Sequence, residues 1–515
     1  MSNSKDESGA DGVMDNLWPI PTHWQWTTLD KLGKIISGGT PSTKESSYWG
    51  GEINWISPSD LTGYTEKRIT RGAKSITDKG LKNSSARLMP KGSVHFSSRA
   101  PIGYVVISNE EITTNQGFKS LVPEQGVFNE YIYYYLKASK QLAESRASGT
   151  TFLEISGKAF GQLPVPLPLE EEQKRIVAKI EELFSELDSG IASLKTAQEQ
   201  LKIYRQALLK HAFEGKLTEQ WRKDNANKLE TPEQLLARIQ TERETRYQQQ
   251  LEEWKQAVKD WEVKGKKGKK PQNPIKPKTH KKLSSDEVIQ LGGLPHDWCW
   301  IRIGDISTVG TGVTPLKSNS LFYGNGDIPW VTSGALNQAF ITKPSDLVTT
   351  KAFNETSLRL YPKNTLVVAL YGEGKTRGKC SELLIEATTN QAIAAIVLEG
   401  KSAGLRRFLK WFLTKNYEEM RLTASGGVQP NLNLGIIERM AIPLCTITEA
   451  EELSSILDEK FSQIDKVDAE ITEQLRKTEV LRQSILKKAF SGQLVPQDPN
   501  DEPASELHGR VKAGN

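Results

Sequence analysis

Residues 20–41 read IPTHWQWTTLDKLGKIISGGTP, and residues 294–315 read LPHDWCWIRIGDISTVGTGVTP. The two stretches share a W-x-W pair and a G-x-T-P turn, in the same order and with the same separation between them. The shared positions are Trp24, Trp26 and Gly38–Pro41 in the first stretch and Trp298, Trp300 and Gly312–Pro315 in the second. Self-similarity at a fixed spacing indicates a repeated structural unit.

The similarity continues beyond these stretches. Thr113–Gln116 recurs as Thr388–Gln391, and Leu208–Gly215 is similar to Ile485–Gly492. The spacing between corresponding positions stays nearly constant from the first of these motifs to the last. Because this spacing changes so little over so many residues, it indicates an internal duplication that covers most of the chain.

Each copy begins with a region of short β-runs between turns, with helical stretches among them. This pattern predicts a strand-rich α+β domain of about 150 residues. The clearest predicted strands are Ile53–Ser57, Ser93–Ser97, Tyr104–Ser108, Ile328–Thr332 and Leu366–Tyr371, and the predicted helical stretches are Asn129–Ser145 and Leu405–Leu422.

A long helix follows the first domain. Three acidic residues, Glu170–Glu172, favour a helix start, because the helix dipole stabilises negative charge in a first turn. Gly215 is a plausible stop, which gives a helix of about 44 residues. Its apolar positions recur at heptad spacing and predict a coiled-coil seam of Ile176, Ile180, Leu183, Leu187, Ile191, Leu194, Leu201 and Leu208.

A second long helix closes the second copy. Thr448 and Glu451 have capping-box spacing at its start, and Thr478 and Arg482 interrupt its seam. The seam residues are Leu453, Leu457, Phe461, Ile464, Ile471, Leu475 and Ile485. We expect the two helices to pair in antiparallel, with one globular domain at each end of the coiled coil.

The segment between the copies, about residues 218–290, has no counterpart. Residues 231–263 are polar and predicted to be helical, whereas the Lys-, Gly- and Pro-rich residues 264–282 predict a flexible linker. The same lysines could bind DNA, although a solvated linker is favoured.

The chain is therefore expected to contain seven segments. They are a disordered N-terminus (1–17), a first domain (18–168), a central helix (169–217), a variable helical and Lys-rich linker (218–293), a second domain (294–444), a C-terminal helix (445–495) and a disordered tail (496–515).

The composition limits the class of protein. The net charge of +5 permits nucleic-acid binding without demanding it. Three widely spaced cysteines, at 299, 380 and 445, predict neither a disulfide framework nor a zinc site. The polar N-terminus is not a secretory signal, and no apolar stretch is long enough to span a membrane. We therefore expect a cytoplasmic protein without membrane contact.

Residues Ala369–Thr376 fit a loose P-loop pattern. A P-loop requires a helix directly after it, whose amides and dipole meet the phosphates. Here a turn and the apolar Leu383–Ile385 follow, and the first copy has a hairpin-like Ser97–Gly103 at this place. We therefore favour a hairpin whose tip could touch DNA phosphates. The six histidines form no metal or triad spacing, and the nearest match to a methyltransferase motif, Asn273–Lys276, is interpreted as part of the linker. A catalytic site is therefore not expected.

Two other features leave alternatives open. The tryptophan pairs could stack on bases, although their alternation favours core packing. The G-x-T-P turns and Thr-Asn-Gln runs could be purely structural, because Asn can close a turn onto the backbone. They could equally face DNA, because Thr, Asn and Gln hydrogen-bond base edges.

The order of these motifs resembles the specificity (S) subunits of Type I restriction-modification systems, over about residues 18–495. The motifs that carry this resemblance are Trp24-x-Trp26 with Leu29 and Gly39–Pro41, Ile53–Trp55, Arg99–Gly103, Thr114–Gln116, and Leu163–Pro168 leading into Glu172, Gln173 and Ile176. The second copy departs from them, because Gly374–Gly378 replaces the Arg-Ala-Pro-Ile-Gly run.

The resemblance implies the fold and the partners. Two similar strand-rich target recognition domains, joined by two long helices that form an antiparallel coiled coil, would each recognise one half of a split site in double-stranded DNA. Two methylation (M) subunits and two restriction (R) subunits would join this non-catalytic chain. It would hold no cofactor, since S-adenosylmethionine would belong to the M subunits, and ATP and magnesium to the R subunits.

Polar side chains of the turns and loops are the candidates for DNA contact. They are Gly39, Thr40, Ser57, Ser98, Arg99, Asn115 and Gln116 in the first copy, and Thr314, Thr332, Lys375, Arg377, Asn390 and Gln391 in the second. The alternative function is a coiled-coil adaptor whose two domains bind protein or carbohydrate.

Overall fold

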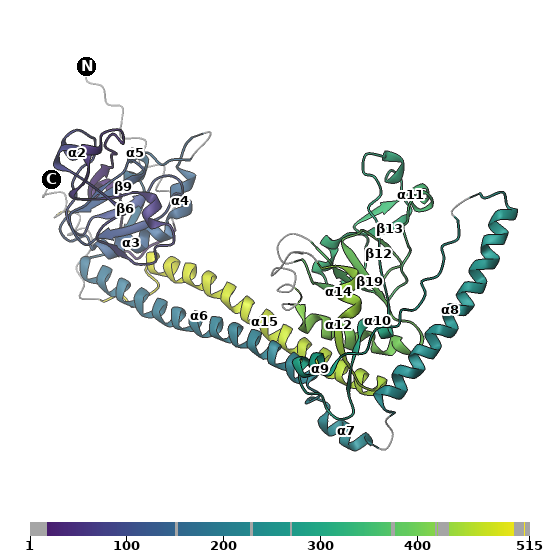
Figure 1. The fold of residues 1–515 in the computed structure, drawn as a ribbon. Helices are drawn as coiled ribbons and strands as arrows, with labels where there is room; N and C mark the ends of the chain where they lie inside the picture. Colours follow the sequence, from purple (N-terminus) through teal and green to yellow (C-terminus); the bar gives the residue numbers. More distant parts are fainter. Residues whose placement is uncertain are drawn as a thin grey trace. The chain divides into compact units, whose positions relative to one another are not determined.

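The computed structural model describes most of the chain and divides it into two compact units (Figure 1). The described residues are 18–149, 153–226, 230–267, 270–371, 376–417, 420, 432–498 and 509. The first unit consists of residues 1–196 and 470–515, and the second of residues 197–469. The predicted disordered N-terminus, 1–17, and most of the predicted tail lie outside the described residues.

The first domain belongs to the first unit. Its strands are β1 (Gln25–Thr28), β2 (Gly33–Ser37), β3 (Trp49–Ile56), β4 (Arg68–Ile69), β5 (Lys74–Ile76), β6 (Val94–Ser97), β7 (Val105–Ser108), β8 (Thr113–Thr114), β9 (Phe118–Pro123) and β10 (Pro164–Leu167). Its helices are α2 (Asp78–Lys82), α3 (Asn129–Ala138), α4 (Lys140–Ser145) and α5 (Gly157–Gly161).

The second domain lies in the second unit. Its strands are β11 (Cys299–Arg302), β12 (Thr308–Thr311), β13 (Ile328–Val331), β14 (Phe340–Ile341), β15 (Asp346–Val348), β16 (Leu366–Ala369), β17 (Cys380–Leu383), β18 (Thr388–Thr389), β19 (Ile393–Val397) and β20 (Ala441–Leu444). Its helices are α10 (Ile303–Ile306), α11 (Thr350–Glu355), α12 (Arg406–Lys415) and α14 (Leu434–Arg439).

The two domains have the same sheet topology. Each contains a five-stranded sheet, ordered β2-β9-β6-β7-β4 or β12-β19-β16-β17-β14. Each also contains a three-stranded sheet, β5-β3-β8 or β15-β13-β18, and a strand pair, β1-β10 or β11-β20. The predicted α+β class and the duplication are therefore confirmed.

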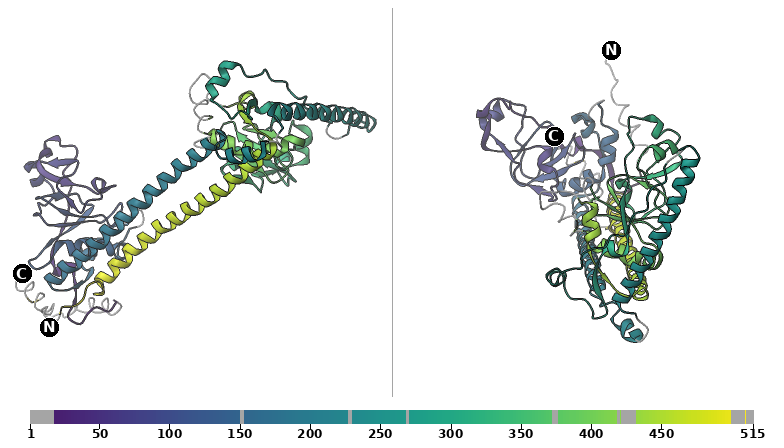
Figure 2. Two further views of the ribbon diagram at one scale, coloured as in Figure 1. Left: turned by 90° about the horizontal axis from the view of Figure 1, so that it is seen from below. Right: turned by 45° about the vertical axis from the view of Figure 1, so that its right-hand side comes forward.

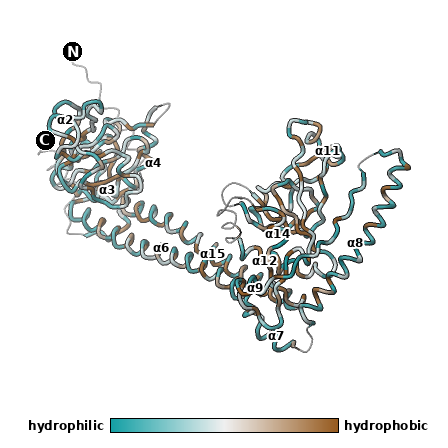
Figure 3. The backbone as a smooth tube through the Cα atoms, viewed as in Figure 1, coloured by the Kyte–Doolittle hydropathy of each residue, from teal (hydrophilic) through white to brown (hydrophobic). Residues whose placement is uncertain are grey.

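The central strands of each five-stranded sheet are buried, as expected for strands covered on both faces. The two most central strands, β6 and β16, are buried at all four positions. Along the long helices α6 and α15, teal and brown residues alternate in Figure 3. Trp24 and Trp298 are buried, as core packing predicts, and Trp26 and Trp300 are half-buried.

The long helices are α6 (Glu170–Phe213) and α15 (Ile447–Phe490), each of 44 residues. The predicted stop at Gly215 is confirmed, since Gly215 has a φ of 71° and its N–H donates to Ala212 O at 3.0 Å. Gly492 ends α15 in the same way, with a φ of 72°. A positive φ is strained for residues with a Cβ, which is why a glycine follows the C-terminal end of each long helix.

The start of α15 differs from the sequence prediction. Thr446 is the cap, because its Oγ1 accepts from Glu449 N at 3.2 Å. Thr448 is already helical, so the capping box predicted at Thr448 and Glu451 is wrong by two residues. The misplacement arose because Thr446 and Thr448 are both good capping residues, and the pattern alone does not choose between them.

The helices pair in antiparallel within each unit. In the first unit, Arg482 donates to Asp188 and its guanidinium lies over the Phe184 ring, 4.8 Å from the centroid. In the second unit, Arg205 donates to Asp465 at 2.5 Å and lies 5.6 Å from the Phe461 centroid. The arginine, the aromatic ring and the aspartate occupy corresponding positions of the two copies. Arg482, which interrupts the predicted seam, is therefore part of a repeated interhelical contact.

The segment between the copies packs partly on the second domain. It contains α7 (Glu219–Asn225), α8 (Pro232–Val263) and α9 (Ser285–Leu291). Figures 1 and 2 show α8 beside the second domain, with its far end standing clear of the sheets. Residues 271–282 have no regular structure but are held by hydrogen bonds, including Trp254 Nε1 to Pro271 O at 3.0 Å. Hydrogen bonds to Leu358 O and to Glu438 also join this stretch, which was predicted to be a flexible linker, to the second domain.

A buried histidine distinguishes the core of the first domain. His95 on β6 is fully buried, and its Nδ1 lies 2.9 Å from Ser120 Oγ on β9. Burial lowers the pKa of His95 to about 3, because the charged imidazolium would lose its hydration. At the paired positions of the second domain, Val367 faces Ala395.

This histidine predicts an acid sensitivity. Below pH 6.5 the unfolded chain takes up a proton at His95 that the folded chain does not, so stability is lost as the pH falls from 6.5 towards 3. Between pH 6.5 and about pH 5 the loss should be about 2 kcal/mol.

The double variant His95→Val, Ser120→Ala copies the pair of the second domain and should remove this part of the pH dependence. Urea unfolding of both proteins at a series of pH values measures the effect. An equally steep loss of stability in the variant would contradict the assignment to His95.

Candidate nucleic-acid interface

The candidate residues of the first domain gather where β2, β3 and β6 end. Backbone hydrogen bonds join these strand ends to the Asn115–Gly117 turn. Gly39 N donates to Thr114 O at 2.8 Å, Asn115 N to Ile56 O at 2.8 Å, and Ser98 N to Gly117 O at 2.7 Å. We call this region the turn edge of the first domain: Gly38–Pro41, Ile56–Pro58, Ser98–Arg99 and Asn115–Gly117.

The second domain builds a matching turn edge from Gly312–Pro315, Val331–Thr332, Leu370–Tyr371 and Asn390–Ala392. Val313 N donates to Thr389 O at 3.0 Å, Asn390 N to Val331 O at 3.0 Å, and Leu370 N to Ala392 O at 2.8 Å. The duplication therefore preserves the backbone frame of the edge as well as the sheets.

A threonine–glutamine pair joins the two motifs in each domain. Thr40 Oγ1 donates to Gln116 Oε1, and Thr314 Oγ1 donates to Gln391 Oε1. Both glutamines are exposed. Because the side-chain oxygen accepts from the threonine, the two amide N–H groups of each exposed glutamine remain as potential donors.

The asparagines of the same runs close the turns. Asn115 Oδ1 accepts from Gly117 N at 2.8 Å, and Asn390 Oδ1 accepts from Ala392 N at 3.2 Å. This is the structural role that sequence reasoning left open for asparagine. These hydrogen bonds close the turn that carries the neighbouring glutamine.

The glycine that makes the edge possible was missed in the candidate set. A Cβ on Gly38 would lie 1.9 Å from Asn115 O, and a Cβ on Gly312 would lie 1.6 Å from Thr389 O. The candidate Gly39 is also crowded, but its second-domain counterpart is Val313. Comparing the two copies position by position could have singled out Gly38.

The serine and threonine after β3 and β13 are held differently in the two domains. Ser57 N and Oγ both donate to Asp60 Oδ2 at 2.7 Å. Thr332 N donates to Ser345 Oγ at 3.0 Å, and the two hydroxyl oxygens lie 3.2 Å apart. The first edge thus carries a carboxylate where the second carries a hydroxyl.

Charged side chains make the first edge different from the second. Glu154, another residue that sequence reasoning missed, accepts from Lys119 Nζ at 3.2 Å and from Arg99 Nη1 at 3.2 Å, and Ser98 Oγ lies 3.4 Å from it. Phe96 and Val368 are equivalent sheet positions that pair with Lys119 and Ala394, so an alanine replaces the lysine in the second domain.

The P-loop-like stretch connects two antiparallel strands, β16 and β17. A strand rather than a helix follows it, so the hairpin prediction is confirmed. Lys375 lies outside the described residues. Arg377 is half-buried next to Gly378, whose φ is 81°, and Lys379 Nζ donates to Asn337 Oδ1 at 2.7 Å.

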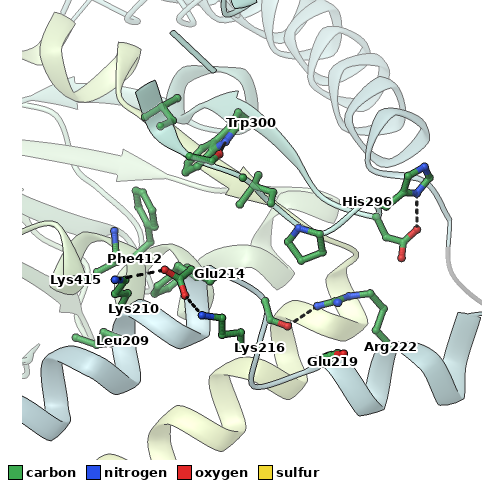
Figure 4. Close-up of a pocket in the computed structure, with 18 of the residues that line it drawn as sticks. Leu209, Lys210, Glu214, Lys216, Glu219, Arg222, His296, Trp300, Phe412 and Lys415 are labelled. Atoms are coloured by element: carbon green, nitrogen blue, oxygen red, sulfur yellow. Dashed lines mark hydrogen bonds and ion pairs between the residues drawn. The ribbon is translucent and has the colours of Figure 1, made fainter. Parts of the chain in front are cut away.

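An open cavity of about 1320 Å³ lies elsewhere in the second unit and shares no residue with the turn edge. It surrounds the end of α6, where Arg222 Nη2 donates to Gly215 O at 2.8 Å and Lys216 pairs with Glu214 at 2.6 Å (Figure 4).

Burial raises the pKa of Cys299 to about 11 and that of Cys380 to about 12, so neither thiol is ionised at neutral pH. Among the described residues, no cluster of His, Cys, Asp or Glu could hold a metal ion.

Comparisons with known proteins agree with this architecture. Residues 21–200 and 295–480 match the family model of the Type I restriction modification DNA specificity domain. The chain is 27% identical to the Type I restriction enzyme MjaIX specificity subunit of Methanocaldococcus jannaschii, over 93% of this chain and 95% of that one. It is 30% identical to the EcoR124I/EcoR124II specificity subunit of Escherichia coli, over 36% of this chain and 48% of that one.

Solved structures share the fold. A chain from a structural study of complex assembly and conformational transition of the type I R-M system aligns with a TM-score of 0.64 at 17% identity, covering 93% of this chain and 100% of that one. The HsdS subunit from Thermoanaerobacter tengcongensis aligns with a TM-score of 0.55 at 17% identity, covering 93% of this chain and 99% of that one.

The family model covers both copies, so the chain belongs to the family of Type I restriction-modification DNA specificity subunits. Specificity subunits are non-catalytic components of a Type I restriction-modification complex and carry no cofactor of their own. Within the described part of the chain, no helix combines the length and apolar character needed to cross a bilayer.

The close approach at Gly38 predicts a large effect of a single methyl group. Gly38→Ala should destabilise the first unit by about 2 kcal/mol or more, because the Cβ overlaps a backbone oxygen that cannot move without breaking the turn. Gly190→Ala is a matched control in the same unit, since Gly190 lies in α6 with open space around it.

The control should stabilise the protein by about 1 kcal/mol, because alanine is a better helix former than glycine. Thermal unfolding of the two variants measures both effects. Equal melting temperatures would show that the turn edge tolerates a side chain at position 38.

Proposed function

We propose that each domain recognises one half of a split DNA target through its turn edge. The single observation that carries this proposal is the pair of matching edges. Both have the same backbone frame and the same threonine–glutamine pair with an exposed glutamine, while the charged groups around them differ. A shared frame with different side chains is what two readers of different half-sites require.

The chemistry of the edge suits base recognition. Exposed amide N–H groups on a hydrogen-bonded turn can donate to acceptors on base edges, and Arg99, Lys119 and Glu154 together leave one net positive charge near them. The candidates Gly39, Thr40, Ser57, Ser98, Arg99, Asn115 and Gln116 lie in or beside the first edge. Thr314, Thr332, Asn390 and Gln391 lie in the second, and Arg377 and Lys375 belong to its β16–β17 connection.

The two long helices would set the separation of the half-sites. Two tethered readers at a fixed spacing convert two weak contacts into one tight contact through their effective concentration. A paired helix provides a stiffer spacer than a flexible chain does.

The proposed assembly contains two methylation subunits and two restriction subunits on this chain, in the cytoplasm. S-adenosylmethionine would be held by the methylation subunits, and ATP and magnesium by the restriction subunits. In this arrangement the chain would recognise the DNA sequence, and its partner subunits would carry out methylation and cleavage.

Selection from a random duplex pool tests the proposal. The purified chain with its methylation partner should enrich a split motif with a constant gap. Enrichment of no motif would contradict the proposal and would leave the coiled-coil adaptor, with protein- or carbohydrate-binding domains, as the alternative.

The glutamines at the two edges should act on separate half-sites. Gln116→Ala should relax the preference within one half of the selected motif, and Gln391→Ala within the other, each by about 1–3 kcal/mol at the affected base pair. Each variant is the control for the other, and selection from the same pool reads out both. If both variants changed the same half-site, the assignment of one edge to each half would be wrong.

The spacer role predicts a change of gap with helix length. Seven residues inserted into α6 near Ile191 and seven into α15 near Glu479 preserve the heptad seam and add about 10 Å. The recognised gap should lengthen by about three base pairs, because B-DNA rises about 3.4 Å per base pair. Binding to a series of duplexes with different gaps measures this. An unchanged best gap in the lengthened protein would exclude the spacer role.

A further inference from the structure

The net positive charge of the chain comes from one short segment. Residues 263–282 contain nine lysines and no acidic residue, although the whole chain has a net charge of only +5. The rest of the chain is therefore net negative. This segment follows α8, and together they form what we call the arm, residues 232–282.

The base of the arm is fixed to the second domain. Leu235 and Ile239 of α8 are buried in its core cluster. Arg243 donates to the carbonyl oxygens of Gly304 at 2.9 Å, Asp305 at 2.6 Å and Ser307 at 2.7 Å. Three hydrogen bonds from one guanidinium hold the direction of the helix relative to this domain.

The end of α8 and the start of the returning chain are described on either side of residues 268–269, which lie outside the described residues. Gly265, with a φ of 72°, ends α8, and Lys266 N donates to Trp261 O at 2.9 Å. The returning chain is then held by the bond from Trp254 Nε1 to Pro271 O. Hydrogen bonds therefore hold the chain next to Lys264, Lys266 and Lys267 on one side and next to Lys270 on the other.

The returning chain rests against the lobe that carries the second turn edge. Gln272 Nε2 donates to Leu358 O at 3.3 Å. Leu358 packs in one cluster with Trp330, whose Nε1 donates to Val313 O in the G-x-T-P turn at 3.2 Å. The returning chain and the turn edge are thus tied to the same small lobe.

The four described lysines within residues 264–270 are exposed, and among the described residues none of them forms an ion pair. Lys278, further along, differs in that it pairs with Glu438 at 2.7 Å. Four unpaired lysines within seven residues of sequence repel one another, and a polyanion that they bind releases its counterions.

We propose that the arm is a second, sequence-independent DNA contact, in which Lys264, Lys266, Lys267 and Lys270 bind backbone phosphates beside the half-site of the second domain. The contact deepens the proposed function and rests on it. It is confined to one half of the target, because the first copy has no segment that corresponds to residues 218–290.

The test compares two quadruple variants in the complex with the methylation partner. One variant changes Lys264, Lys266, Lys267 and Lys270 to Gln, and the other changes the same four residues to Arg. A further control changes four exposed lysines of the long helices, Lys195, Lys202, Lys466 and Lys477, to Gln. The affinity for the target duplex and for an unrelated duplex is measured between about 50 and 200 mM salt.

The Gln variant should reduce the slope of log affinity against log salt by about 2–4, since each phosphate contact contributes about 0.9. It should weaken both duplexes by a similar factor, of about tenfold or more at the lowest salt, and leave the selected motif unchanged. The Arg variant and the helix control should retain the wild-type slope.

An unchanged slope in the Gln variant would overturn the proposal. The proposal would also be overturned if the Gln variant no longer assembled with the methylation partner while its slope of log affinity against log salt stayed unchanged. That result would assign the lysines to binding an acidic protein surface. These failures are distinct from failure of the proposed function, which would appear as a wild-type complex that prefers no duplex over another.

Discussion

The antiparallel pairing of α6 and α15 is the constraint on which the rest of the structure depends. Each helix begins against the domain that precedes it in the chain and ends in the unit of the other domain. Pro21 lies at the end of α15, where a Cβ on Gly492 would approach its Cγ to 2.3 Å, and Pro295 lies at the end of α6 with the same 2.3 Å approach to Gly215. The two copies therefore complete one another, and neither domain packs on its own helix alone.

The repeat made much of this fold predictable from sequence. A duplicated sequence has to build the same sheets twice, and heptad spacing identifies the long helices by their apolar seam. The cap at Thr446 and the role of Arg482 were less accessible. In the first case two capping residues compete locally, and in the second a charged residue in an apolar seam is explained only by its partners across the helices, Asp188 and Phe184.

The candidate site was predictable in part for a related reason. Local motifs gave Thr40 and Gln116, whereas their pairing joins residues that are 76 positions apart. Glu154 has no motif at all, and its contact with Lys119 depends on the sheet register. Sequence motifs can therefore predict which residues form the backbone of the turn edges. The charged groups that distinguish the two edges can be identified only from tertiary contacts.

Two matched edges in one chain make sense if the chain has to recognise two different short sequences in one orientation. The most direct measurement of this claim is genome-wide mapping of methylated adenines in a host that carries the complete system. We expect a single split motif, with two unlike half-sites and a constant gap, methylated on both strands. Methylation at a continuous motif, or no motif that depends on this chain, would contradict it.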